Sequence, residues 1–150
     1  MNIFQALIVD HEKQRELCAR LLDAKQASDE SLRLFDDLKS ELAAHETAEE
    51  RFFYVPLFEH DSTVDASRHA IAEHHEMDEM VEEIEKLDAH ALEWARAVQK
   101  LCDKVEHHLK EEEEKFFPQA GEVLTEEQKV ALAADYTAEH AAMLAKETEA

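Results

Sequence analysis

Glycine is nearly absent from this sequence, with one residue in 150, and proline occurs twice. Sheet proteins use both residues in their turns, so this scarcity disfavours a strand-rich fold. Alanine, leucine, glutamate and lysine, which favour helix, are abundant instead. The length suits one domain with its own hydrophobic core. We therefore expect an all-α fold in which residues 1–150 form a single domain.

Basic residues are also scarce, with 16 Lys and Arg against 37 Asp and Glu and a formal net charge of -21. Nucleic acids and anionic membranes bind to clustered Lys and Arg, so we expect neither as a partner. The apolar run from Ile3 to Val9 is too short for a membrane span and lacks the flanks of a signal peptide. The two cysteines, Cys18 and Cys102, are isolated on apolar faces, which favours buried thiols over a disulfide. These features predict a cytoplasmic protein.

The hydrophobic pattern has helical periodicity through most of the chain. It predicts helices at about residues 3–24, 28–58, 64–87, 88–118 and 126–148. Short connections favour antiparallel neighbours, so the first four helices are expected to form an up-down-up-down four-helix bundle over about residues 3–118. The additional C-terminal helix should pack on this bundle.

Each half of the predicted bundle carries one lone histidine and one His-x-x-x-Glu pair. The three residues of the first half recur 63 positions later in the second half, and all of them lie on apolar helix stripes. In an up-down-up-down bundle, these positions are at similar distances from one end. We expect convergence in one core layer of six residues: His11, His45, Glu49, His74, His108 and Glu112.

Buried carboxylates need a compensating charge, and no Lys or Arg occupies a corresponding inward position. Metal cations would supply that charge. A mixture of imidazole and carboxylate ligands suits iron, manganese or zinc better than calcium or magnesium. Carboxylates from two helices can bridge two ions, so the pattern predicts a pair of metal ions. His107 lies on a solvent-facing row, which is why we choose His108 as the ligand.

The other histidines, Glu46 and the glutamates beside Glu112 are expected at the surface. Glu46 is the best candidate for an extra ligand, although a helix-surface position is the favoured interpretation. In the run Glu111–Glu114, only Glu112 is expected to face inward. His140, on the last helix, is the one surface histidine that could cover the site. The ferritin pattern Glu-x-x-His and the zinc-protease pattern His-Glu-x-x-His are both absent.

Several segments together resemble the hemerythrin-like family, specifically the HHE cation-binding domain, over His11 to Pro118. They are Asp-His at 10–11, His-Glu-Thr-Ala-Glu-Glu at 45–50, Phe-Phe-Tyr-Val-Pro at 52–56, Glu-His-His-Glu at 73–76, His-Leu-Lys-Glu-Glu-Glu-Glu at 108–114 and Phe-Phe-Pro at 116–118. The resemblance implies two iron ions in an oxo- or hydroxo-bridged di-iron centre. It also implies that the two glutamates bridge the ions and that the histidines are terminal ligands.

The sequence departs from the oxygen-carrying members of that family. In the oxygen carriers, the third helix has a second histidine, and the last motif ends in an aspartate five positions after its histidine. Here position 70 is alanine, position 78 is aspartate, and the last motif is His-x-x-x-Glu. The loss of one terminal histidine predicts an open coordination position, which favours reaction over reversible oxygen carriage.

The sequence thus predicts a non-haem di-iron protein that binds or reacts with O2, peroxide or nitric oxide, in sensing, detoxification or iron handling. Two alternatives stay open at this point. One is repair of damaged iron centres under nitrosative stress, as in relatives with the same ligand pattern. The other is a metal-buffering or structural helical module that binds zinc. Enzymatic turnover and a protein partner are not predicted from the sequence.

Overall fold

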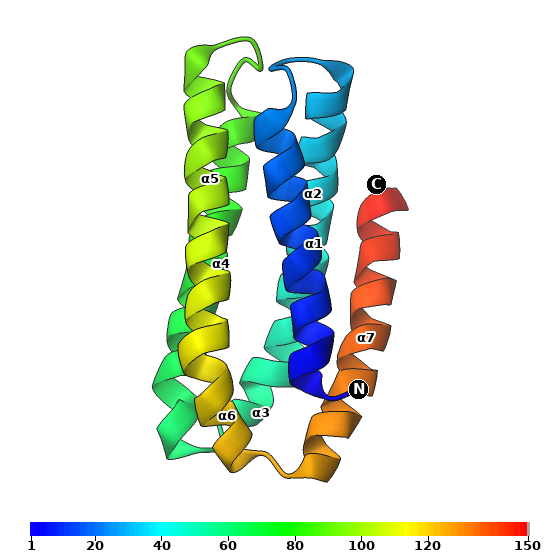
Figure 1. Ribbon diagram of the computed structural model, residues 1–150, viewed down its shortest axis with the longest axis vertical. Helices are drawn as coiled ribbons and strands as arrows, with labels where there is room; N and C mark the ends of the chain where they lie inside the picture. The colour runs from blue at the N-terminus through cyan, green and yellow to red at the C-terminus, as the bar shows by residue number, and fades with distance from the viewer. Residues whose placement is uncertain (150) are drawn as a thin grey trace.

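The computed structural model describes residues 1–149, and all regular structure in that range is helical. The first hairpin pairs α1 (Ile3–Asp23) with α2 (Asp29–Glu49), and the second pairs α4 (Asp61–Glu85) with α5 (Leu92–Glu111). These four helices run alternately up and down the long axis of the molecule (Figure 1). The predicted all-α, up-down-up-down bundle is confirmed.

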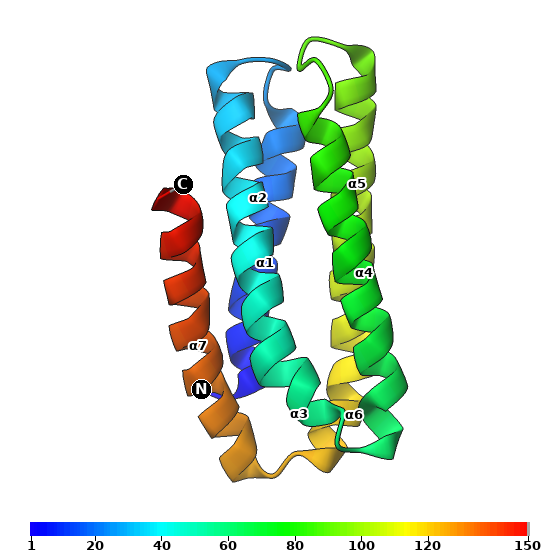
Figure 2. The ribbon, with the colours of Figure 1, turned by 180° about the vertical axis from the view of Figure 1, so that it is seen from behind.

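Two short helices lie at the end of the bundle where the chain begins, and a third, longer helix starts there (Figure 1). Short pieces extend two of the long helices: α3 (Val55–Leu57) continues the path of α2, and α6 (Phe117–Val123) continues that of α5. A tight connection then leads into α7 (Glu126–Glu149), which runs back along the outside of α1 and α2 (Figures 1 and 2). The fifth predicted helix therefore packs on the first hairpin.

Side-chain caps fix where several helices begin. At the start of α1, the Asn2 side chain accepts from the Gln5 backbone N–H, and the Gln5 side chain accepts from the Asn2 backbone N–H. Thr125 and Gln128 form the same reciprocal pair before α7. The Ser28 hydroxyl accepts from the Ser31 backbone N–H at the start of α2. Such caps satisfy amides that lack intrahelical partners.

Two π-helical turns interrupt the helices at equivalent places, η1 (Glu50–Tyr54) after α2 and η2 (Glu112–Phe116) after α5. In each turn a backbone N–H reaches the carbonyl five residues earlier, from Val55 to Glu50 and from Phe117 to Glu112. A proline lies two residues beyond the last residue of each turn, and its ring has no N–H to continue the α-helical ladder.

The first π-helical turn changes which residues face the core. It inserts one extra residue, so the inward stripe moves by one position beyond Glu49. Phe53, Tyr54 and Leu57 are fully buried, whereas Phe52 is only half-buried. A continuous α-helical stripe would not place Tyr54 inside, so helical spacing alone does not predict its burial.

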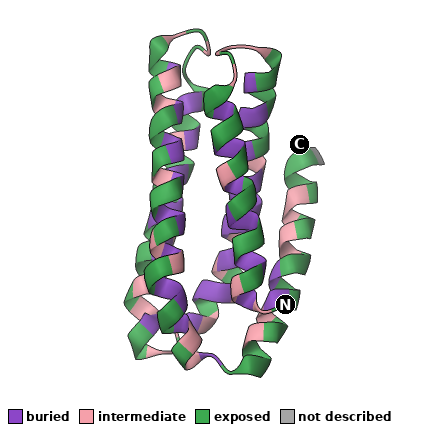
Figure 3. Ribbon diagram, in the orientation of Figure 1, coloured by how far each residue is buried: buried purple, intermediate pink, exposed green. Residues whose placement is uncertain are grey.

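The core contains two apolar clusters with a polar layer between them. In α1, for example, Ile3, Ala6 and Leu7 belong to one cluster and Leu17, Cys18 and Leu21 to the other. The buried polar residues Asp10, His11 and Gln14 lie between these two sets. Buried faces of all four bundle helices turn toward this interior (Figure 3). Both cysteines are free and buried in the cluster distant from the N-terminus, as predicted.

Candidate metal centre

All six residues predicted to converge lie in the polar layer of the bundle. Each has 3% or less of its surface exposed. His11 comes from α1, His45 and Glu49 from α2, His74 from α4, His108 from α5, and Glu112 from the start of η2. His107, the neighbour rejected on helical spacing, has a side chain that is 66% exposed. The helical stripes therefore selected the inward-facing residues correctly.

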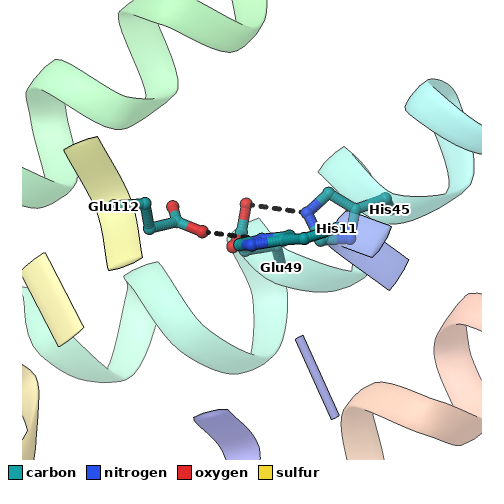
Figure 4. Close-up of side chains that lie close together, drawn as sticks. All are labelled: His11, His45, Glu49 and Glu112. Carbon is teal, nitrogen blue, oxygen red and sulfur yellow. Dashed lines mark ion pairs between the residues drawn. The ribbon is translucent and has the colours of Figure 1, made fainter. Parts of the chain in front are cut away.

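The inward-facing residues form two groups whose ligand atoms lie within 4.8 Å of one another. The first consists of His11, His45, Glu49 and Glu112 (Figure 4). In it, His11 Nε2 lies 3.2 Å from Glu112 Oε1, and His45 Nε2 lies 3.3 Å from Glu49 Oε1. One histidine therefore faces each carboxylate.

The second group consists of Glu49, His74 and His108. His74 Nε2 lies 3.1 Å from Glu49 Oε1, and His108 Nε2 lies 3.7 Å from Glu112 Oε2. Both carboxylates thus contact one histidine of the first hairpin and one of the second. They occupy the middle of the site, between two pairs of imidazoles.

Several atoms that face the middle of this layer lack hydrogen-bond partners. They include the Nε2 atoms of His11, His45 and His108, together with Glu49 Oε2 and Glu112 Oε1. Buried polar atoms are almost always paired, because burial without a partner costs roughly 1–3 kcal/mol for each group. Convergent imidazole nitrogens and carboxylate oxygens are suitable donors for a transition metal, so the residues present fit a metal centre.

Three of the histidines are held on their outer side by a second residue. His11 Nδ1 lies 2.7 Å from Glu113, and His108 Nδ1 lies 2.9 Å from Glu73. His45 Nδ1 lies 2.5 Å from the hydroxyl of Tyr136. An Nδ1–H that donates outward leaves Nε2 free to bind a metal, and this is the usual arrangement around metal-binding histidines.

The two outer carboxylates are themselves paired with basic side chains. Arg15 contacts both oxygens of Glu113, at 2.9 and 3.0 Å, and Lys104 Nζ lies 2.9 Å from Glu73. Burial alone would raise the pKa of each carboxyl, but hydrogen bonds to the histidines and to these cations lower both pKa values to about 2. Glu73 and Glu113 therefore stay ionised and hold the imidazoles in place.

His74 is held differently from the other three histidines. Its Nδ1 has no hydrogen-bond partner, and the nearest carboxylate, that of Glu50, is 4.0 Å away. Burial lowers the pKa of His74, but contacts with Glu49 and Glu50 outweigh this effect and raise that pKa to about 10. Without a metal, His74 is therefore protonated at neutral pH.

Tyr54 lies between the two central carboxylates. Its hydroxyl is 2.7 Å from Glu49 Oε1 and also hydrogen-bonds to Glu112. The same oxygen lies 3.4 Å from His74 Nε2. Burial and the two adjacent carboxylates raise the pKa of Tyr54 well above its ordinary value, so it stays protonated as a donor. In the sequence, Tyr54 lies in the Phe-Phe-Tyr-Val-Pro segment at 52–56, and Pro56 accompanies the π-helical turn that places it inside.

Two acidic residues that were expected at the surface are not there. Glu46 is 5% exposed, so the favoured surface interpretation was wrong. It belongs to neither ligand group, one of its oxygens lacks a partner, and burial raises its pKa well above the ordinary value. Glu113 was expected to be solvated, but it contacts His11. The helix-surface argument failed because neighbouring helices cover these positions.

His140 of α7 was also expected among the surface histidines, but it takes part in a buried network beside the ligand layer. Its side chain is 13% exposed, and Nε2 lies 3.0 Å from Glu41 and 3.6 Å from Asp10. Asp10 accepts a hydrogen bond from the Tyr136 hydroxyl, which in turn contacts His45. The last helix therefore contributes two side chains around the candidate metal centre.

A cavity of about 340 Å³ opens between α4 on one side and the end of α5, η2 and α6 on the other. His108 and Glu112 of the ligand layer line its inner part, together with Ala70 and Phe116. Ala70 lies one turn before His74, and its small side chain leaves space beside the site. The cavity therefore reaches the predicted ligands from the surface.

The fold and the buried histidine and glutamate groups together define a helical-bundle protein with a candidate cation-binding core. The sequence model of the Hemerythrin HHE cation binding domain matches residues 2–120. The chain belongs to this family, as its motifs had indicated.

Comparison with solved structures agrees with this assignment. The chain is similar to the crystal structure of a hemerythrin HHE cation binding domain-containing protein from Mycobacterium kansasii. The TM-score is 0.89 at 22% sequence identity, and the match covers 97% of this chain and 89% of the other. That similarity supports a shared fold. No curated protein sequence gives a match. Within residues 1–149, no helix is both long enough and apolar enough to cross a membrane.

Proposed function

We propose that this chain binds two iron ions through His11, His45, Glu49, His74, His108 and Glu112. The observation that carries the proposal is the central position of Glu49 and Glu112, each between one histidine of the first hairpin and one of the second. Carboxylates in this position can bridge two metal ions, with the imidazoles as terminal ligands. Iron suits this donor set, and manganese and zinc are the competing metals.

Bound iron would supply the redox chemistry that O2, peroxide or nitric oxide requires. The chain itself supplies access and selection. The cavity beside Ala70 admits a small molecule to the side of the site formed by His108 and Glu112. Tyr54 places a protonated hydroxyl between the two carboxylates, where it can donate a hydrogen bond to a small ligand. These features favour a reactive centre in detoxification, sensing or iron handling.

We also propose that residues 1–150 act as one unit, although the family match ends at residue 120. Tyr136 of α7 contacts His45 of the ligand layer directly. The two free thiols, Cys18 and Cys102, are consistent with a reducing cytoplasmic setting.

Metal analysis with absorption spectroscopy tests this proposal. Metal-free protein is loaded with Fe(II) without oxygen, desalted and then exposed to air, peroxide or nitric oxide. The proposal expects about two irons per chain, because two ligand groups are present. It also expects new near-ultraviolet bands on oxidation. Loss of the iron on desalting, with zinc retained in a parallel sample loaded with Zn(II), would contradict it and favour the metal-buffering or structural alternative.

A further inference from the structure

A further group of potential metal ligands lies at the outer end of the cavity. It consists of His69 and Glu73 on α4 and Glu111 at the end of α5. His69 Nε2 lies 3.5 Å from Glu73 Oε1 and 3.4 Å from Glu111 Oε1. The side chain of His69 is 58% exposed and that of Glu111 is 30% exposed, so a hydrated cation can reach this group from solvent.

This outer group continues into the metal centre. All three of its members line the cavity that His108 and Glu112 line on the inside. His108 Nε2 and Glu112 Oε1 are buried atoms without hydrogen-bond partners. Glu73 joins the two ends, because its Oε1 atom is 3.5 Å from His69 and 2.9 Å from His108 Nδ1. Ligand side chains therefore line this cavity from its surface end to the core.

Charges around the outer group favour cations. Asp65 lines the cavity, and the whole chain carries a net charge of -21. Two basic side chains oppose this effect: Lys115 lines the cavity, and Lys104 contacts Glu73 at 2.9 Å. His107 Nε2 lies 3.2 Å from the other oxygen of Glu111. A strongly negative protein with a ligand-lined cavity concentrates divalent cations at its entrance.

We propose that His69, Glu73 and Glu111 form a transit site through which divalent metal ions enter the buried centre. The inference rests on the proposed metal centre and adds the route by which that centre is loaded. An incoming ion exchanges part of its water shell for His69 and Glu111, and then passes along Glu73 to His108 and Glu112. Stepwise exchange avoids moving a fully hydrated ion into an apolar bundle, which is the costly alternative.

Loading kinetics test this route. Metal-free protein is mixed with limiting Co(II) in a stopped-flow spectrometer, and the visible absorption of bound cobalt is followed over time. The variants are His69→Ala, Glu111→Gln and the two combined. We expect the combined variant to load about tenfold more slowly, the lower end of electrostatic effects on association rates. Its final metal content and melting temperature should equal those of the wild type.

His90→Ala is the matched control, because His90 is a similarly exposed histidine, 81% by side chain, in the connection between α4 and α5 at the opposite end of the bundle. Its loading rate should stay at the wild-type value.

Equal rates for all variants, with two ions bound at the end, would overturn the transit site and leave the metal centre intact. A third ion retained in wild type after desalting and lost in His69→Ala would also overturn it, since the group would then be a storage site. A wild type that retains no metal would instead overturn the proposed function.

Discussion

The Nδ1 atom of His45 lies 2.5 Å from the hydroxyl of Tyr136, although the two residues are 91 positions apart in the sequence. Tyr136 belongs to α7, beyond the residues that the family model matches. Its hydroxyl also donates to Asp10, which is buried beside His11. The C-terminal helix thus fixes the orientation of a predicted ligand rather than only covering the bundle.

Tyr136→Phe should weaken metal binding while the fold is retained. Loss of an outer partner of a metal-binding histidine typically lowers metal affinity by about 10–100-fold. Competition with a chromogenic chelator measures this change. Val130→Ala on the same helix is the control, because Val130 is 56% exposed. An unchanged affinity in Tyr136→Phe would show that His45 needs no outer partner.

Glu49→Gln and Glu46→Gln form a matched pair of buried substitutions on α2. Glu49 belongs to both ligand groups, so its amide variant should lose most of the bound metal. Glu46 belongs to neither group but is also buried on the same helix, so its amide variant reports the effect of a buried substitution without loss of a ligand. Metal content after desalting should therefore fall in Glu49→Gln alone. Equal losses in the two variants would make Glu46 a ligand.

His108→Ala and His107→Ala test the facing of α5 at adjacent positions. His108 Nε2 points into the site without a hydrogen-bond partner, whereas His107 is exposed and pairs with Glu111. His108→Ala should retain about one metal ion per chain, because the group around His11 and His45 stays intact. His107→Ala should retain the wild-type content. Elemental analysis distinguishes these outcomes, and similar losses in both would contradict the assignment.

The metal-free protein should lose stability in acid partly through Glu73 and Glu113. Their pKa values are lowered from 4.5 to about 2, so their contribution is fully present above pH 4.5 and is lost as the pH falls toward 2. The raised pKa of His74 adds no slope there, since it is protonated in both states well below 6.5. Thermal unfolding in chelator at pH 6 and pH 3.5 measures the effect.

The melting temperature of Glu73→Gln should fall less than that of the wild type when the pH is lowered from about 6 to about 3.5, because the titrating carboxyl group is absent. Glu76→Gln, at a carboxylate on the same helix that is 59% exposed, serves as the control. An identical decrease in Glu73→Gln and wild type would show that the Glu73 carboxylate is not stabilised by its partners.

The sequence was sufficient to predict the helices and the inward histidines and glutamates. Helical periodicity is local, so the buried face of each helix can be recognised from spacing of three and four residues along that helix alone. The repeat at 63 positions then aligned His11 with His74 and Glu49 with Glu112 without any structure. The free, buried state of both cysteines followed from the same stripes.

Tertiary structure decided what surrounds that layer. Tyr54 faces inward because a π-helical turn shifts the buried stripe by one residue. A regular helical period does not predict such a shift. Glu73, Glu113 and Tyr136 hold the histidines from other helices, and their roles depend on the distance and rotation between helices. A single helix determines only which of its own faces is apolar. Contacts between side chains far apart in the sequence exist only once the helices have packed.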